Sequence, residues 1–155
     1  MNIEKIYIIL HNVSSIQRVH DVARIVFSTE NKFILVITKP TGAAAQIAIP
    51  EIFREAYKHN KPIIILPDLK DAIDLLKPDQ IYTLSHEYGE RINPENLELK
   101  PKTAFITAGT EPGLSKNEAL TGKPIYIKGF NTWIGPAGET AIIIHTITNK
   151  IKNEN

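Results

Sequence analysis

Short apolar runs alternate along the chain with segments whose apolar positions recur at helical spacing. The runs are rich in isoleucine and valine and unbroken by polar residues, which is typical of strands buried on both faces. The alternation predicts an α/β fold, in which helices cover both faces of a mostly parallel sheet. The predicted strands are residues 5–10, 33–38, 62–66, 80–84, 103–107 and 124–128.

Four helices are expected between and after these strands. The first, within residues 14–28, has Ser14 or Ser15 as its N-cap, and the second spans residues 50–59 with a proline in its first turn. A short third helix covers residues 70–77 with Asp68 as its cap, and the last begins near Pro136. Residues 86–102 are polar and aperiodic and predict a long surface connection.

Composition narrows the class of protein. A chain of 155 residues with 43% hydrophobic content suits one core, so residues 1–155 are expected to form a single domain. The charge balance, 18 Lys plus Arg against 17 Asp plus Glu, predicts no strong global attraction to nucleic acid or membrane. The absence of cysteine excludes disulfides and thiolate chemistry. The apolar amino-terminal run is shorter than the roughly 20 residues that span a bilayer, so a cytoplasmic protein is expected.

Two loops punctuated by glycine follow consecutive predicted strands, in AFITAGTEPGL and PIYIKGFNTWIGPAG. Ligands of open parallel sheets bind outside the carboxyl ends of the strands, where both loops fall. Glycine permits positive φ and lets a ligand lie against the backbone. Any one of these glycines is better explained by a turn, but their clustering predicts a ligand site.

These two loops resemble motifs of the SPOUT class of RNA methyltransferases. AFITAGTEPGL is similar to the second motif, PIYIKGFNTWIGPAGETAIIIHTI to the third, and HNVSSIQRVHDVARIVFS to the first, with its asparagine loop and helix. The ARIVF segment and the GETAIII helix start look like the archaeal tRNA ribose-methylating branch. The resemblance implies a carboxyl-terminal trefoil knot around S-adenosylmethionine, an RNA substrate such as tRNA or rRNA, and a homodimer built on the first-motif helix and the final helix.

The resemblance also implies a cofactor site built mostly from backbone groups, with apolar walls that include Ile127, Ile134 and Trp133. Trp133 is equally well explained as a core or interface aromatic. The residues implied to bind the cofactor are Gly109, Thr110, Gly113, Leu114, Ile127, Lys128, Gly129, Ile134 and Pro136.

In ribose 2'-O-methylation, an arginine near the hydroxyl that receives the methyl group is expected to hold an RNA phosphate and to stabilise the alkoxide that develops on that oxygen. Arg24 is the first candidate and Arg18 the second, each against the alternative of a solvated helix arginine. Glu111 is expected to position loop or substrate groups, or else to be a surface carboxylate. Asn12 is expected to touch RNA or the loop backbone, or else to form an Asx turn.

Departures from the motifs leave two other functions open. The loop of the second motif, which contains Glu111, is one residue shorter than in the family, and the third motif lacks Ser-Leu-Asn. A catalytically inactive RNA-binding or scaffold homodimer is therefore the alternative. A metal-dependent nuclease is less favoured, because its only partial carboxylate set is Asp68, Asp71, Asp74 and Glu111. The histidines have no ligand-like spacing, so no metal site is expected, and the sequence offers no interleaved basic and aromatic patch for RNA.

Overall fold

A parallel sheet forms the centre of the protein in the computed structural model, which describes residues 2–154. Its seven strands follow the order β3-β2-β1-β6-β4-β7-β5, and every neighbouring pair is parallel. The strands are β1 (Lys5–Val13), β2 (Phe33–Pro40), β3 (Ile63–Leu66), β4 (Gln80–Leu84), β5 (Glu90–Ile92), β6 (Lys102–Ala108) and β7 (Lys123–Ile127).

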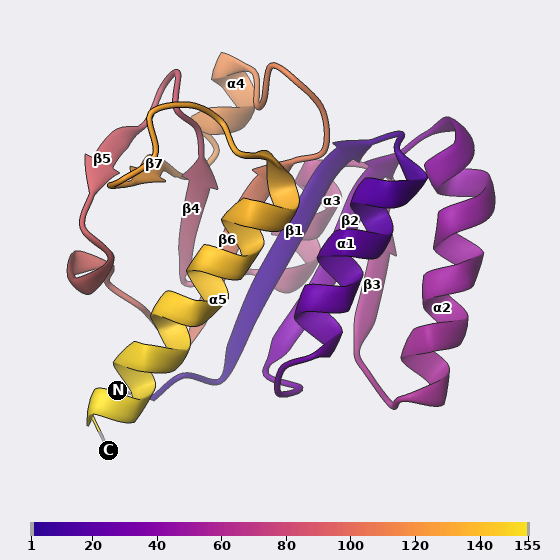
Figure 1. Ribbon diagram of the computed structural model, residues 1–155, viewed down its shortest axis with the longest axis horizontal. Coiled ribbons are helices and arrows are strands. Elements are labelled where there is room, and N and C mark those ends of the chain that lie inside the picture. The colour runs from indigo at the N-terminus through magenta and orange to yellow at the C-terminus, as the bar shows by residue number, and fades with distance from the viewer. Residues whose placement is uncertain (1, 155) are drawn as a thin grey trace.

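Helices lie on both faces of this sheet, as predicted. Figure 1 shows α1, α2 and α5 side by side across one face, with α3 behind the sheet. The helices are α1 (Ile16–Phe27), α2 (Ile49–Lys58), α3 (Leu69–Leu76), α4 (Lys116–Ala119) and α5 (Gly135–Glu154), with a π-helical turn η1 (Ala44–Ala48) and a 3-10 turn η2 (Pro94–Asn96). Within residues 2–154, no helix is long and apolar enough to cross a membrane.

The unbroken apolar strands are buried because each faces a hydrophobic core on both sides. In β1, Ile6 and Ile8 pack in the core under α1, α2 and α5. Tyr7 and Ile9 pack in the second core, with residues of α3 and α4. Successive side chains of a strand point to opposite faces, so a strand covered twice cannot alternate apolar and polar residues. The predicted α/β class is therefore confirmed.

Local caps set where two of the helices begin. The Ser15 hydroxyl accepts a hydrogen bond from the Arg18 backbone N–H at 3.2 Å, which starts α1. Asp68 and Asp71 form a capping box at the start of α3, in which each carboxylate accepts from a backbone N–H of the other end of the turn. The predicted caps at Ser15 and Asp68 are confirmed.

The prediction that residues 86–102 form a surface connection without regular structure was wrong. This segment contains β5, which pairs with β7 at the edge of the sheet, and the turn η2. A three-residue edge strand leaves too short a pattern to recognise, and its pairing depends on β7 rather than on its own side chains. The sequence also did not predict the π-helical turn η1 or the short helix α4.

The strand order places a topological switch point between β1 and β6. From β1 the chain adds β2 and then β3 in one direction, whereas the later strands extend the sheet in the other. In open α/β sheets, ligands bind at such points, outside the carboxyl ends of the strands. The carboxyl-terminal trefoil knot remains a prediction of the resemblance.

Gly109, directly after β6, lies against β1 at this switch point. Its N–H donates to the carbonyl of His11 at 2.8 Å. A Cβ on Gly109 would lie 2.6 Å from Cβ of Val13 and 2.7 Å from the carbonyl oxygen of Asn12. Both distances are below van der Waals contact, so only glycine permits this approach.

We therefore expect Gly109→Ala to lower the free energy of unfolding by about 1–3 kcal/mol through forced separation of β1 and β6. Gly138→Ala in α5 is the matched control, because its Cβ would meet only the movable Ile134 side chain, at 3.0 Å, and alanine favours helix. Urea unfolding of both variants measures the difference. Equal stability of the two would contradict the packing account.

Candidate functional site

Three loops meet at the carboxyl edge of the sheet, where the strands β6, β4 and β7 are neighbours. They comprise residues 85–89 after β4, 109–115 after β6 and 128–134 after β7, and the last leads directly into α5. Gly113, Gly129 and Gly135 have positive φ values of 111°, 111° and 88°, which other residues rarely adopt. The glycine punctuation therefore serves backbone turns at these three positions and close packing at Gly109.

Arg18 ties the first turn of α1 to two of these loops. Its Nη1 donates to the carbonyl of Gly109 at 2.9 Å, and its guanidinium carbon lies 5.3 Å from the ring centroid of Trp133. Arginine satisfies both contacts because its planar guanidinium can stack on an aromatic face while its edge donates hydrogen bonds. Arg18 thus lies at the predicted site, with further N–H groups beyond the one bound to Gly109.

Arg24, the first candidate from the sequence, lies elsewhere. Its side chain is 76% exposed and approaches Asp21 at 3.9 Å on the same helix. It lines a groove between α1 and α2 rather than the strand-end loops. The structure therefore brings Arg18, and not Arg24, together with the glycine loops.

The other two catalytic candidates lie at the same edge in different settings. Asn12 is half-buried near the end of β1 with a φ of 61°, and its carbonyl faces Gly109. Glu111 is exposed in the loop after β6. Asn12 therefore contributes to the packing of that loop, whereas Glu111 is open to a partner.

The predicted cofactor residues divide between the interior and the rim of the site. Gly109, Leu114 and Pro136 are buried, and Ile127 and Ile134 line a cavity between β7 and α5. Lys128 and Gly129 are exposed on the loop that follows β7. Thr110 and Gly113 are half-buried in the loop after β6.

The cavity between β7 and α5 is narrow and mostly apolar, with a free volume of about 20 Å³. His86 forms part of its wall, held at 4.4 Å from the ring of Tyr126, with Nε2 at 3.0 Å from the carbonyl oxygen of Phe130. Its lining residues are Leu84, His86, Tyr126, Ile127, Phe130, Ile134, Glu139, Ile142 and Ile143.

Glu139, in the second turn of α5, is the residue at this site that the sequence reasoning missed. It is only 8% exposed and accepts a hydrogen bond from the Thr107 hydroxyl at 2.7 Å. Burial raises its pKa to about 7, although the Thr107 hydroxyl and the nearby indole of Trp133 act in the opposite direction. The helical spacing of the sequence could have pointed to it, because Glu139 falls on the buried side of α5 with Pro136, Ile143 and Ile147.

Three buried polar atoms near this region have no hydrogen-bond partner among the described residues. They are Nδ1 of His86, Nε1 of Trp133 and Oγ1 of Thr140. Trp133 Nε1 comes close enough to influence the pKa of Glu139 but lacks the geometry of a hydrogen bond. Buried polar groups are nearly always paired, so unpaired ones are consistent with a ligand that completes them.

His11 holds helix α4, which follows the loop of residues 109–115. It is 1% exposed, its Nε2–H donates to the carboxylate of Glu118 at 2.7 Å, and its Nδ1 pairs with the Thr38 hydroxyl at 2.8 Å. Burial would raise the pKa of Glu118, but hydrogen bonds from the Ser115 backbone and from His11 outweigh it and lower the pKa. Both ring nitrogens are occupied away from solvent, so His11 holds α4 against β1 and β2 and is not placed to move a substrate proton.

The carboxylates do not form a metal centre. Among residues 2–154, no group of three or more histidines and carboxylates is arranged to hold a metal ion. Asp68 and Asp71 are engaged in capping α3, and Glu111 lies on a different loop. The described carboxylates therefore do not fit the clustered metal site of a metal-dependent nuclease.

Comparison of the chain with protein families gives a match over residues 42–146 to the family described as RecB-family nuclease (DUF2122). This chain belongs to that family. A relative in Aeropyrum pernix, named "Putative type II restriction enzyme ApeKORF2002P", is 40% identical over 139 residues, which cover 88% of each chain.

The fold of this family member is shared with RNA methyltransferases. A structure described as "Structural insights into the 2-OH methylation of C/U34 on tRNA" matches with a TM-score of 0.78 at 12% identity, over 97% of this chain and 98% of that one. The SpoU methyltransferase AviRb of Streptomyces viridochromogenes matches with a TM-score of 0.76 at 10% identity, over 98% and 62%. An AdoMet-bound rRNA methyltransferase of Sinorhizobium meliloti matches with a TM-score of 0.69 at 13% identity, over 94% and 56%. The expected SPOUT-type fold is thereby supported.

The buried Glu139 predicts how stability depends on pH. Its pKa is about 7 in the folded protein against 4.5 for an ordinary glutamate, so the folded state binds the proton more tightly. The contribution of Glu139 to the free energy of unfolding is therefore complete below pH 4.5 and is lost as pH rises through 7. The loss is about 3 kcal/mol in total, because one pKa unit corresponds to about 1.4 kcal/mol.

Urea unfolding at pH 5 and pH 8 measures this effect. We expect Glu139→Gln to reduce the fall in stability between the two values, because glutamine fills the same space without ionising. Asp74→Asn, at an exposed position on α3, is the control and should leave the fall unchanged. An unchanged pH dependence in Glu139→Gln would mean that Glu139 does not titrate in this range.

Proposed function

We propose that this protein is an S-adenosylmethionine-dependent RNA methyltransferase that acts on a ribose 2'-hydroxyl of tRNA or rRNA. The observation that carries the proposal is the arrangement at the carboxyl edge, where the end of β4, the glycine loop after β7 and α5 surround a cavity containing a buried carboxyl group. The sheet that positions these loops has the fold of RNA methyltransferases along nearly its whole length.

The residues around the cavity suit the proposed cofactor, which supplies a methyl group on a cationic sulfonium. Glu139 offers a carboxyl whose pKa is near neutrality, so a cation beside it would favour its ionised form. The unpaired nitrogens of His86 and Trp133 offer hydrogen bonds to polar groups of a nucleoside. Ile127 and Ile134 supply apolar walls that exclude water.

Binding requires the loop of residues 128–134 to move. The cavity of about 20 Å³ cannot contain a molecule of this size, because ligand pockets typically measure about 300–1,000 Å³. Phe130 and Ile134 cover the cavity and are 38% and 37% exposed, so they can swing outward without opening a packed core. Gly129 and Gly135, with positive φ, flank this segment.

Arg18 is the residue that we assign to the RNA acceptor. Its guanidinium is fixed by the Gly109 carbonyl and by the ring of Trp133, which orients its remaining N–H groups. Such groups can hold a phosphate next to the ribose and stabilise the negative charge that develops on the attacking oxygen. A fixed donor is effective because it needs little reorganisation during the reaction.

Nuclease activity is the second candidate, and the names of the family and of its Aeropyrum pernix relative favour it. The described residues lack the cluster of carboxylates and histidines that a metal-dependent nuclease uses. We therefore derive no cleavage step and treat nuclease activity as an outcome of experiment. The inactive, RNA-binding homodimer is the remaining alternative.

Calorimetric titration with S-adenosylmethionine and with S-adenosylhomocysteine, whose thioether sulfur carries no charge, tests the cofactor site. If Glu139 faces the sulfonium, S-adenosylmethionine should bind more tightly at pH 8 than at pH 6, whereas S-adenosylhomocysteine should show little change. Glu139→Gln should remove this difference, and Asp74→Asn, at an exposed position of α3 on the other face of the sheet, should retain it. Absence of binding by folded wild-type protein would rule out the proposed cofactor.

Incubation of the protein with tRNA and radiolabelled cofactor, and separately with plasmid DNA and Mg²⁺, then distinguishes the two activities. Methyl incorporation supports the proposal, and metal-dependent cleavage without it supports the nuclease. Cofactor binding without either activity indicates the inactive homodimer. Light scattering at micromolar concentration tests the expected dimer independently.

For methyl transfer we expect Arg18→Lys to reduce kcat by about 100-fold or more, because lysine cannot reproduce the oriented fork of N–H groups. Cofactor affinity should change little. The control is Arg91→Lys, at an exposed position on the edge strand β5. A variant with wild-type kcat would show that Arg18 only stabilises the loop.

A further inference from the structure

We propose that the groove between α1 and α2, together with the outer face of α2, binds a single-stranded segment of the RNA substrate. In this arrangement phosphates lie against Arg24, Arg54 and Lys58, and bases stack on Phe53 and Tyr57. The identification of RNA rests on the proposed function, whereas the surface itself is argued from its side chains.

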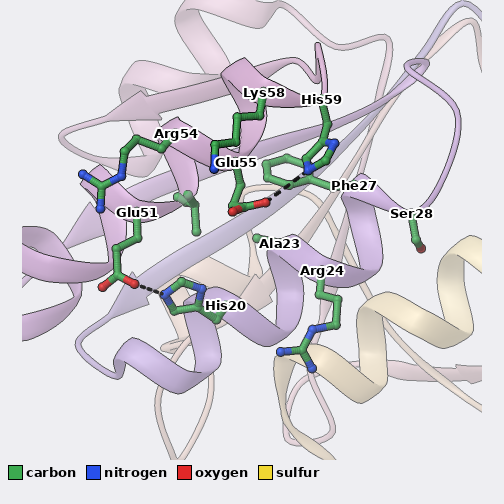
Figure 2. A pocket seen from close by; sticks show the side chains of 11 residues that line it. His20, Ala23, Arg24, Phe27, Ser28, Glu51, Arg54, Glu55, Lys58 and His59 are labelled. Atoms are coloured by element: carbon green, nitrogen blue, oxygen red, sulfur yellow. Dashed lines mark ion pairs between the residues drawn. The ribbon is translucent and has the colours of Figure 1, made fainter.

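The groove is open and has a volume of about 550 Å³. Arg54 and Lys58 on α2 and Arg24 on α1 line this space, and Figure 2 shows the Arg24 guanidinium on the side of α1 that is turned away from α2. Phe27, at the end of α1, supplies part of the apolar wall at one end of the groove. The groove therefore has cations on both of the helices that border it.

The acidic residues of the groove are engaged by histidines. Glu51 lies 3.4 Å from Nε2 of His20, and Glu55 lies 3.3 Å from Nε2 of His59, as the dashed lines in Figure 2 mark. Of the three cations, Arg24 has a long contact of 3.9 Å with Asp21. Arg54 and Lys58 have no ion-pair partner among the described residues. With the histidines neutral, the lining therefore carries three cations against two carboxylates, and Arg54 and Lys58 are available to phosphates of a nucleic acid chain.

Aromatic residues lie beside these cations on the outer face of α2. Tyr57 is 90% exposed and Phe53 is 46% exposed, which is unusual for large side chains on a folded domain. Residues four apart lie on the same side of a helix, so Phe53 and Tyr57 form one stripe, and Arg54 and Lys58 form the adjacent one. Phosphate contacts and stacking surfaces are therefore one residue apart along the helix, which corrects the expectation from the sequence that no interleaved basic and aromatic patch is present.

This combination selects single-stranded nucleic acid from among the partners that an exposed apolar stripe could bind. Proteins that bind single strands combine a positively charged groove along the backbone with aromatic side chains on which bases stack. A double-stranded segment would keep its bases paired and leave Phe53 and Tyr57 without a stacking partner. An apolar protein surface would instead bury Arg54 and Lys58 without compensating charge.

The groove also lies on a path from the proposed active site. Arg18 and Arg24 are on the same helix, and six residues of α-helix span about 9 Å along its axis. Successive nucleotides of one RNA strand could therefore meet Arg18 at the carboxyl edge and then the cations of the groove. Arg24 would then bind substrate away from the reacting atoms.

The test measures binding of the full chain to a fluorescein-labelled oligouridylate of about 12 nucleotides by fluorescence anisotropy, a length within the usual site size. Phe53→Ala and Tyr57→Ala should each weaken binding by about tenfold through loss of stacking, whereas Tyr57→Phe should retain it. Arg54→Ala and Lys58→Ala should each reduce the slope of log K against log salt by about 0.7.

Matched controls lie on α3, on the opposite face of the sheet: Leu75→Ala and Lys70→Ala, both at exposed positions, should leave affinity and salt slope unchanged. Circular dichroism checks that every variant is folded. Wild-type affinity in all of the α2 variants, or no binding by wild type, would overturn the proposal. Tighter binding of duplex DNA, weakened by the same substitutions, would overturn its assignment to RNA.

Titration of the same variants with S-adenosylmethionine separates this inference from the proposed function. The α2 substitutions should not alter cofactor affinity, because none of these residues lines the cavity at β7 and α5. RNA binding with the predicted losses but without cofactor binding would support the surface and overturn the methyltransferase. Cofactor binding with unchanged RNA affinity in the variants would support the cofactor site and overturn the RNA-binding surface on α2.

Discussion

The close approach of β6 to β1 is the constraint on which the carboxyl edge of this protein depends. Gly109 has no room for a side chain against Val13 and Asn12, and its N–H donates to His11 in the neighbouring strand. This approach brings the Gly109 carbonyl within reach of Arg18, which in turn lies over Trp133 from the loop after β7. One missing Cβ thus permits three segments far apart in the sequence to converge at the switch point of the sheet.

The family carries the name of a nuclease, whereas the solved structures that share the fold are RNA methyltransferases. Fold alone does not determine function, because function depends on the residues grafted onto it. Here the carboxylates that a metal-dependent nuclease would need are dispersed, and two of them cap α3. Among residues 2–154, Glu139 is the carboxyl group that is both buried and raised in pKa, and it lines a mostly apolar cavity. A cation beside this carboxyl would favour its ionised form, which is the basis of the proposed cofactor site.

Two surfaces with separate chemistry emerge from this arrangement. At the carboxyl edge, burial raises the pKa of Glu139 and holds His11 away from solvent, so both depend on the protein interior. Along α1 and α2, the groups are exposed and their interactions with a partner would be sensitive to salt. Because α1 contributes Arg18 to one surface and Arg24 to the other, a single helix connects the proposed reaction site with the proposed substrate surface.

The sequence by itself determined the α/β class, six of the strands, the cap at Asp68 and a cap at Ser14 or Ser15, because these follow from local burial patterns and from hydrogen bonds within one turn. The structure selects Ser15. It also indicated the glycine loops at consecutive strand ends. Tertiary structure alone decided that Arg18 rather than Arg24 reaches those loops, since both lie on the same helix and only packing selects the face that meets Gly109. It likewise decided the short strand β5, whose pairing comes from β7, and the exposure of Phe53 and Tyr57. An aromatic residue in a helix is apolar whether it faces the core or solvent, and only the position of the neighbouring elements determines which.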